Sequence, residues 1–332
     1  MSFLSSLALS TQGALAQGVL WGLMVLGVYI TYKLLDIADL TADGSFTLGG
    51  CVCTVAIISG VNPVLATLMG LLAGALAGAV TGILHTVFEI PAILAGILTQ
   101  IGLWSVNLRI MGGKANNPLL KSQSIISYVS DTTGLTQSQA SLLVGIVLAF
   151  IVIALLYWFF GTEIGSALRA TGDNPDMIRA LGVNIGHMKL IALSLSNALI
   201  GLSGAMVAQM QKYADINMGR GAIVIGLAAI VIGEVLLRRV KNFGLKLFSA
   251  VIGSMVYFVI QAYVLKMGLN PNDMKLLSAI LVALALAIPV AAAKYRQKRS
   301  YVEYDLYAEQ RVHGEATGKA QDAAKEKGGA EK

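Results

Sequence analysis

Residues 161–184 read GTEIGSALRATGDNPDMIRALGVN and form the longest polar stretch between two strongly apolar runs of the chain. The pattern predicts two short helices joined by a tight turn. The first helix is expected from Thr162 to Thr171 and to stop at Gly172, because glycine readily takes the left-handed conformation that closes a helix.

A second helix is predicted to begin directly after this stop. Asp173 and Asn174 offer side-chain oxygens that can cap its N-terminus, and Pro175 suits the first helical position. Asp176 favours the positive end of the helix dipole, and Gly182 can end the helix.

Residues that end one helix and begin the next follow each other directly here, and they predict a stiff helix–turn–helix segment, residues 161–184, which we call the elbow. A loop that only connects two membrane spans does not need such residues, so we interpret the elbow as a docking surface. An ordinary interfacial helix fits the same local signals.

The rest of the chain is strongly apolar. Of its 332 residues, 56% are hydrophobic and 13% are charged, and the mean hydropathy is +0.74. These charges are too few to cover a soluble globule, so the sequence predicts an all-α, polytopic membrane protein of about nine transmembrane helices. The expected spans are 14–35, 45–60, 62–84, 90–111, 141–160, 187–210, 221–238, 245–265 and 275–293.

Orientation follows from the basic residues, which collect on the cytoplasmic side of a membrane protein. If nine spans alternate, three basic segments lie on one face, with the N-terminus outside and the C-terminus in the cytoplasm. The net charge of +6 is therefore a topology signal, and no nucleic-acid partner is expected. The basic residues are Arg169, Arg179, Lys189, Arg238, Arg239, Lys241, Lys246, Lys294, Arg296, Lys298 and Arg299.

The elbow resembles the cytoplasmic loop of ABC importer permeases of the branched-chain amino acid and ribose class. The matching residues are Arg169, Ala170, Gly172, Asn174, Pro175, Ala180, Leu181, Gly182 and Val183. In that family such a segment is the coupling helix, which sits in a groove of a separate ATPase subunit. The phrase IVIGEVLL at residues 230–237 is similar to a subgroup sometimes assigned to aromatic amino acids.

The resemblance implies a set of partners in a bacterial inner membrane. An ATPase subunit hydrolyses ATP, an extracytoplasmic binding protein delivers a small solute such as an amino acid, and a second permease copy completes a homodimer. The chain itself is then a translocation subunit and not an enzyme. The residues expected to couple to the ATPase are Arg169, Gly172, Asp173, Asn174, Pro175, Met177, Arg179, Leu181 and Gly182.

Residues 36–50 interrupt the apolar sequence with three aspartates and three glycines. Broken helices at membrane depth occur where they line protein or water. Asp43 or Ser45 could cap a half-helix that points its amides at a substrate path, whereas a plain cytoplasmic turn is the alternative. The segment resembles a signature near the second span of the same permease family, with two extra residues before Gly44.

Six polar or aromatic residues are candidates for the substrate pathway. Asn197 is the strongest candidate for a pathway hydrogen bond, while Gln100 also fits a bond between helices. Glu234 is the one carboxylate well inside an apolar run, although an ion pair with Arg238, four residues on, is favoured. The complete set is Asp43, Ser45, Phe46, Gln100, Asn197 and Glu234.

Glycine spacing predicts close helix packing and an internal repeat. The third span carries Gly70, Gly74, Gly78 and Gly82 at four-residue spacing, which lets another helix approach closely. Residues 218–253 echo the layout of 43–82 from the opposite side of the membrane. This favours an inverted repeat of spans one to four against six to nine.

The sequence divides into a transmembrane domain, residues 1–293, which contains the coupling loop 161–186, and a cytoplasmic tail, residues 294–332. The tail is mixed, small and charged, and is expected to be largely disordered. Cys51 and Cys53 are expected to be packing residues, and scattered histidines favour no metal site or cofactor. Residues 112–139 form a long outer connection on which a binding protein could dock.

One other class of protein fits the composition, an ion-coupled secondary transporter or channel that has no ATPase partner. Such a carrier should bury several charges at mid-membrane, and it has no need of a docking elbow. The importer is therefore the favoured interpretation.

Overall fold

The computed structural model describes residues 3–120, 122–237 and 242–268, together with scattered positions between 273 and 294. It divides into two units, Met1–Val282 and Ala283–Lys332, and the helices and strands named below belong to the first unit. Arg238, most of the predicted ninth span and the tail lie outside the described residues.

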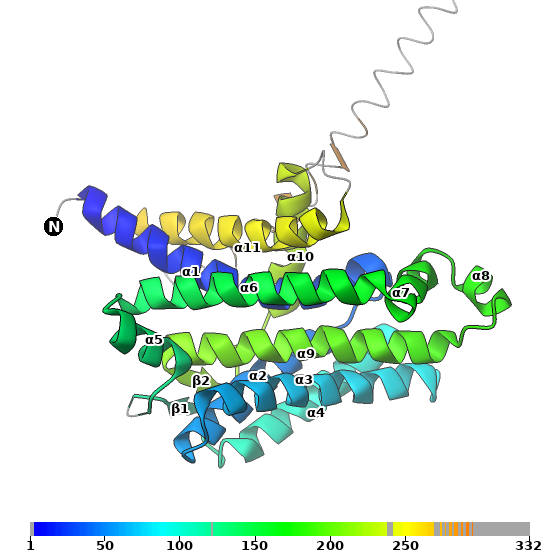
Figure 1. Ribbon diagram of the computed structural model, residues 1–332, viewed down its shortest axis with the longest axis horizontal. Helices are drawn as coiled ribbons and strands as arrows, with labels where there is room; N and C mark the ends of the chain where they lie inside the picture. Colours follow the sequence, from blue (N-terminus) through cyan, green and yellow to red (C-terminus); the bar gives the residue numbers. More distant parts are fainter. Residues whose placement is uncertain are drawn as a thin grey trace, which may run out of the picture. The chain divides into compact units, whose positions relative to one another are not determined.

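The described part of the chain is helical apart from one short pair of strands (Figure 1). Its long helices are α1 (Phe3–Tyr29), α2 (Thr41–Ile58), α3 (Pro63–Thr86), α4 (Ala92–Ile110), α6 (Gln137–Gly161), α9 (Ile185–Gln211), α10 (Ala222–Leu236) and α11 (Phe243–Lys266). A π-helical turn, η1 (Ile30–Leu34), extends α1, and the short elements are α5 (Ile125–Thr133), α7 (Glu163–Asp173), α8 (Pro175–Ala180), β1 (Asn116–Pro118) and β2 (Tyr213–Asp215).

Seven described helices are long and apolar enough to cross a membrane, and they confirm an all-α, polytopic membrane protein. The predicted second span begins earlier than expected, at Thr41. The seventh, predicted at 221–238, is α10, which has 15 residues. At 1.5 Å per residue it is about 22 Å long, too short for about 30 Å of hydrocarbon. A full span there is not confirmed.

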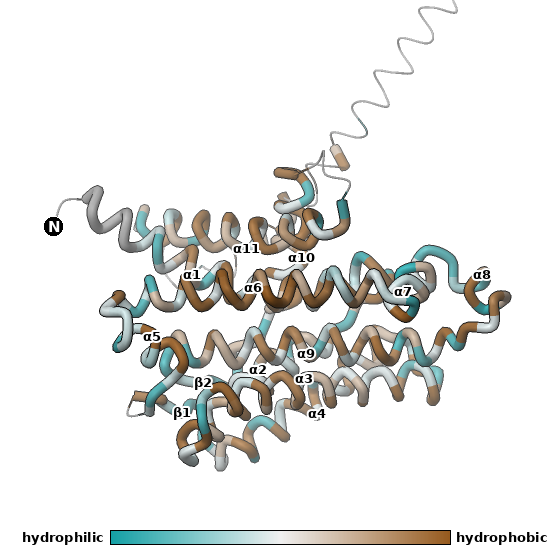
Figure 2. The backbone as a smooth tube through the Cα atoms, viewed as in Figure 1, coloured by the Kyte–Doolittle hydropathy of each residue, from teal (hydrophilic) through white to brown (hydrophobic). Residues whose placement is uncertain are grey.

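Helix α9 is the central element of the bundle, and it packs against α1, α2 and α3. Most of α9 is buried, whereas α4 and α6 leave most of their apolar side chains at least partly exposed. Figure 2 shows α6 as hydrophobic along nearly its whole length. An exposed apolar surface of this extent is suited to lipid.

The glycine stripe of α3 packs against α9, as its spacing predicts. A Cβ atom on Gly74 would overlap the carbonyl oxygen of Asn197, and one on Gly78 would overlap that of Leu193. Because these neighbours are backbone atoms, only glycine permits the approach. The two helices therefore meet backbone to backbone.

Serine hydroxyls join α9 and α11 to α1. The Oγ atoms of Ser196 and Ser203 donate to the carbonyls of Gly27 and Leu20, over 2.8 and 2.7 Å. Ser254 donates in the same way to Gly18, over 2.8 Å. These bonds cross between helices and hold α1 against both neighbours.

The predicted long connection 112–139 contains regular secondary structure on both sides of Lys121, which lies outside the described residues. Strand β1 pairs antiparallel with β2, and Ser124 caps α5 by accepting from the Ser127 amide. The backbone amide of Ile125 donates to Gln209 of α9 over 2.9 Å. The connection is thus fixed to the end of the central helix.

Candidate functional site

The elbow consists of α7 and α8, and its local signals are largely confirmed. Asn174 caps α8, because its Oδ1 accepts from the Met177 amide over 3.0 Å. Pro175 opens the helix, and Gly182 follows it with a φ of +83°, in the left-handed region that favours glycine. Thr162 caps α7.

Gly172 has a different role from the predicted helix stop. It lies within α7, which continues to Asp173, so Asp173 ends the first helix and does not cap the second. A Cβ atom on Gly172 would overlap the carbonyl oxygen of Leu34 in η1. The glycine is therefore required for close packing of the elbow on the end of the first span.

The elbow presents two exposed apolar side chains, one on α8 and one directly after it, while a third side chain anchors α8. Met177 and Leu181 are 49% and 70% exposed, whereas Ile178 between them is 4% exposed. Arg179 pairs with Asp176 over 3.6 Å at the surface. An apolar pair displayed on a capped helix has the form of a protein-binding surface.

The elbow also contacts the start of α11. The guanidinium of Arg169 lies over the ring of Phe243, 5.1 Å from its centroid. Phe243 in turn packs edge-on against Phe160, near the end of α6. Arg169 thus fixes α7 to the membrane helices through a cation–π contact.

A buried polar pair lies near the midpoint of α9. The Asn197 Nδ2 donates to Asp39 Oδ2 over 2.6 Å, and the Thr41 amide donates to Asp39 Oδ1 over 3.0 Å. Asp39 belongs to the non-helical segment between η1 and α2, in which buried residues alternate with the exposed Asp36 and Ala38. The chain therefore breaks before Thr41, whereas the glycines of the predicted interruption lie within α2. The buried carboxylate of the break is Asp39.

Asp43 joins two helices that begin in the interior. It lies in the first turn of α2, and its carboxylate accepts from the amides of Gly221 and Ile223 over 2.8 and 3.0 Å. It therefore satisfies the N-terminus of α10, whereas the sequence predicted a cap for its own helix. The negative charge suits the positive end of the α10 dipole.

The structure brings two of the predicted pathway residues into one pocket. Asp43 and Gln100 line a pocket of about 340 Å³ between α2, α4 and the segment before α10. Phe46 is buried and stacks on Trp21 with ring centroids 4.6 Å apart. Ser45 is buried too, and its hydroxyl has no partner among the described residues. Neither Phe46 nor Ser45 lines the pocket.

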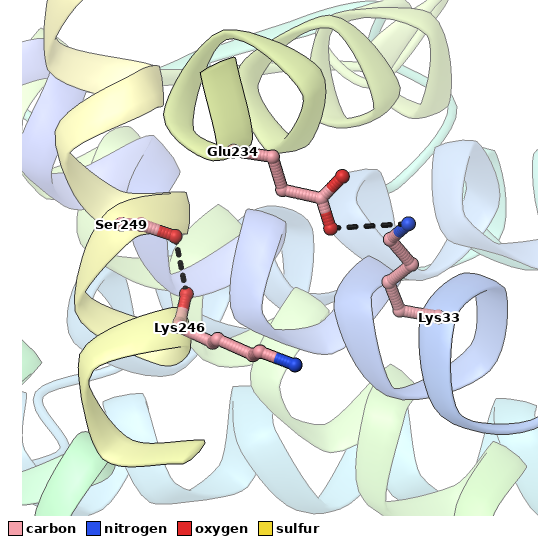
Figure 3. Close-up of polar contacts among 4 residues, drawn as sticks. All are labelled: Lys33, Glu234, Lys246 and Ser249. Atoms are coloured by element: carbon pink, nitrogen blue, oxygen red, sulfur yellow. Dashed lines mark hydrogen bonds and ion pairs between the residues drawn. The ribbon is translucent and has the colours of Figure 1, made fainter. Parts of the chain in front are cut away.

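Glu234 lies apart from this pocket, near the end of α10. It pairs with Lys33 of η1 over 3.1 Å, and both side chains are 39% exposed. Figure 3 shows the pair bridging α10 and η1, beside Lys246 of α11. The favoured partner Arg238 lies outside the described residues. The structure gives Glu234 a partner that is distant in sequence.

Sequence reasoning also missed two residues. Asp39 was counted among three aspartates but not singled out, and its partner Asn197 comes from a helix far along the chain. Arg220 lines the pocket with Asp43, and it lies in MGRGA just before α10. An arginine between two glycines at the entry to an apolar helix was the available signal.

Comparisons with known proteins agree with this architecture. The family described as "Branched-chain amino acid transport system / permease component" matches residues 10–295. A tyrosine transport system permease protein of Clostridioides difficile (strain R20291) is 39% identical over 273 residues, covering 82% of this chain and 89% of the relative.

Two further relatives extend the comparison. An uncharacterized protein of Rickettsia prowazekii (strain Madrid E) is 33% identical over 82% of this chain and 95% of its own. An autoinducer 2 import system permease protein of Yersinia pseudotuberculosis is 31% identical over 58% of this chain and 53% of its own. No solved structure matches. The chain belongs to the family of branched-chain amino acid transport system permease components, the membrane subunits of binding-protein-dependent ABC transporters.

Proposed function

We propose that this chain forms the membrane pathway of an ATP-driven amino acid importer. A second copy of the chain, two ATPase subunits and an extracytoplasmic binding protein complete the complex. A homodimer is the simplest assembly, because the chain offers one elbow and each ATPase requires one. The N-terminus lies outside and the elbow lies in the cytoplasm of a bacterium, with the complex in the inner membrane.

The observation that carries the proposal is the construction of the elbow. Met177 and Leu181 present apolar surface to the outside, while Ile178 anchors the same short helix to the protein. The Asn174 cap and Pro175 fix the shape of α8. A rigid apolar projection suits a groove in a partner that must push on it, as the ATPase of an importer does.

Contacts of the elbow define a route from this surface into the membrane domain. Gly172 of α7 packs on the carbonyl of Leu34, and the chain continues from Leu34 to Asp39, whose carboxylate binds Asn197. Arg169 contacts Phe243 at the start of α11. Movement of α8 is therefore transmitted to the interior segment through packed backbone and to α11 through a ring contact.

The two interior helix starts support an inverted repeat. Helices α2 and α10 both begin inside the protein, where Asp43 joins them. From this junction α2 leads to the outer connection, and α10 leads toward Lys33 at the end of the first span. Opposed helices that begin inside the protein resemble the broken helices by which many transporters form a solute path.

An amino acid is the proposed solute. One relative, similar over most of both chains, is a tyrosine transport system permease protein. L-Tyrosine is therefore the first substrate to test. The binding protein would select the solute before it reaches the permease.

The carboxylates of Asp39, which is buried, and Asp43, which is partly buried, favour one alternative, an ion-coupled carrier. Each of them accepts at least two hydrogen bonds from the protein and so has a structural role. A carrier has no need of an exposed apolar elbow, so the importer remains the better supported function.

The test is uptake into proteoliposomes that contain the permease and its ATPase, with the binding protein outside. We expect L-tyrosine uptake to require ATP inside and to persist when the proton and sodium gradients are collapsed. Uptake that follows an ion gradient without ATP would contradict the proposal and favour the carrier.

A further inference from the structure

The pocket beside Asp43 holds an arrangement of charges that the packing of helices does not explain. It is lined by Asp43 and Thr47 of α2, by Gln100, Trp104 and Asn107 of α4, and by Arg220. Its volume of about 340 Å³ falls within the range of ~300–1,000 Å³ typical of small-molecule sites.

Arg220 is fixed in this pocket by its two neighbours. The Gly219 amide donates to Thr47 Oγ1 over 3.1 Å, and the Gly221 amide donates to Asp43 Oδ2 over 2.8 Å. The backbone of Arg220 is thus tied to α2 on both sides. Its guanidinium has no ion pair among the residues that the structure describes.

Arg220 is exposed at the edge of the protein interior. It precedes α10 directly, and Gly226, one turn into that helix, packs against Met24 and Val28 of α1. An exposed guanidinium that lines a pocket and has no ion pair among the described residues is available to an anionic group of a ligand.

The pocket contains further hydrogen-bonding capacity that the protein does not use. Asn107 is 1% exposed, and its Oδ1 has no partner within the described part of the chain. Its Nδ2 has only a long contact of 3.5 Å with the Gly44 carbonyl. A buried amide oxygen without a partner costs about 1–3 kcal/mol unless a ligand or water satisfies it.

We propose that this pocket binds the zwitterionic head group of an α-amino acid during translocation. The ligand carboxylate pairs with Arg220, and the ligand ammonium lies toward Asp43 and the amide oxygens of Gln100 and Asn107. The exposed faces of Trp104 and Ile101 form the apolar wall for the ligand side chain. The inference rests on the proposed function and names the residues that contact its solute.

Charge complementarity explains why the ligand needs both its carboxylate and its ammonium group. An amine without a carboxylate would leave the Arg220 charge unpaired, and a carboxylic acid without an ammonium would face Asp43. A site that places polar groups to pair with a particular group of the ligand rejects analogues that lack that group, because the site's own polar groups are then left unpaired. The pocket therefore discriminates by ligand charge, separately from the binding protein.

The direct test measures binding without the binding protein. Labelled L-tyrosine and L-tyrosinamide, which lacks the carboxylate charge, are titrated against the purified permease–ATPase complex. We expect the wild type to bind L-tyrosine at least tenfold more tightly than the amide. Arg220→Gln should lose this difference, because its neutral side chain offers no charge to the carboxylate.

Arg109→Gln is the matched control, because it removes the same charge from an exposed position on α4 that does not line the pocket. It should keep the wild-type preference. Equal binding of both ligands by the wild type, or an unchanged preference in Arg220→Gln, would overturn the proposed site.

Uptake assays separate this inference from the proposed function. If the wild type transports L-tyrosine with ATP, and Arg220→Gln transports it at the same turnover, the importer stands and the pocket assignment fails. If the wild type shows no ATP-dependent uptake of any amino acid, the proposed function itself fails. If turnover falls at least tenfold in Arg220→Gln but not in Arg109→Gln, the result supports both the importer function and the pocket assignment.

Discussion

Asn197, near the midpoint of the central helix α9, donates a 2.6 Å hydrogen bond to Asp39, although 158 residues separate them in sequence. Both side chains are buried. The bond fixes the non-helical segment after the first span to the centre of the bundle. That segment also connects Leu34, which the elbow contacts, to the start of α2. The position of the segment therefore affects the elbow contact and the placement of α2.

Removing the donor should destabilise the bundle. In Asn197→Leu, the branched shape and the number of side-chain heavy atoms are kept, but the Asp39 carboxylate loses one of its hydrogen bonds. Because bonds to buried charged groups are worth about 1.5–3 kcal/mol, we expect a clear fall in the midpoint of thermal unfolding of the purified protein. Ser194→Ala on the same helix is the control, since the Ser194 hydroxyl has no partner among the described residues. Equal midpoints for both variants would contradict the role of the bond.

The glycine stripe gives a prediction about assembly of the fold. Gly74→Ala and Gly78→Ala each place a Cβ atom on an α9 carbonyl, so α3 and α9 must separate. Overpacking typically costs about 1–3 kcal/mol, and it should reduce the yield of folded protein in the membrane. Gly102→Ala on α4 is the control, because a Cβ atom there meets nothing within 4 Å. The prediction is measured by fluorescence-detected size exclusion, and a loss in all three variants would refute it.

Local signals in the sequence were reliable guides to the elbow and to the glycine stripe. Asn174, Pro175 and Gly182 act within one or two turns of the chain, so their neighbours in sequence determine their roles. Gly74 and Gly78 were found because the four-residue spacing is a property of one helix. The partner helix α9 was not identified by that spacing.

Roles that depend on distant segments were missed or misassigned. Asp43 caps a helix about 180 residues away, and the partner of Glu234 is Lys33. Gly172 had the local signature of a helix stop, yet the close approach of Leu34 determines its role. No pattern within a short window contains this information, because it arises only when the helices pack.

The Lys33–Glu234 pair should contribute little to stability. Both side chains are 39% exposed, and exposed ion pairs are typically worth less than about 1 kcal/mol. We expect Glu234→Gln to unfold thermally almost as the wild type does and to retain ATP-dependent uptake. Loss of uptake with normal folding would instead give Glu234 a role in the pathway, which its position outside the pocket does not support.

Gly172→Ala tests the mechanical link between the elbow and the first span. The added methyl group overlaps the Leu34 carbonyl, so α7 must move away from η1. We expect the complex to hydrolyse ATP while its uptake falls several-fold. Gly161→Ala, at the end of α6, is the control, because its Cβ atom would lie in open space. The link is refuted if both variants transport at the wild-type rate.

The elbow surface itself is tested by changing only its chemistry. Met177 and Leu181 are exposed on the short helix, so replacing both by Asp should leave the membrane fold unchanged. If they sit in an apolar groove of the ATPase, two carboxylates there lose their hydration without a partner and weaken the contact. We expect Met177→Asp/Leu181→Asp to uncouple ATP hydrolysis from uptake, or to release the ATPase during purification, while the binding protein still docks.

A conservative exchange separates apolar contact from general disturbance of the elbow. Met177→Leu/Leu181→Met keeps the apolar area and the approximate volume, so it should transport as the wild type does. The measurement is substrate-stimulated ATPase activity followed together with uptake in the same proteoliposomes. Wild-type values for both in the Asp variant would exclude these two residues as the ATPase contact. A loss in the conservative variant as well would mean that the shape of α8, fixed by Asn174 and Pro175, matters more than the apolar character of its face.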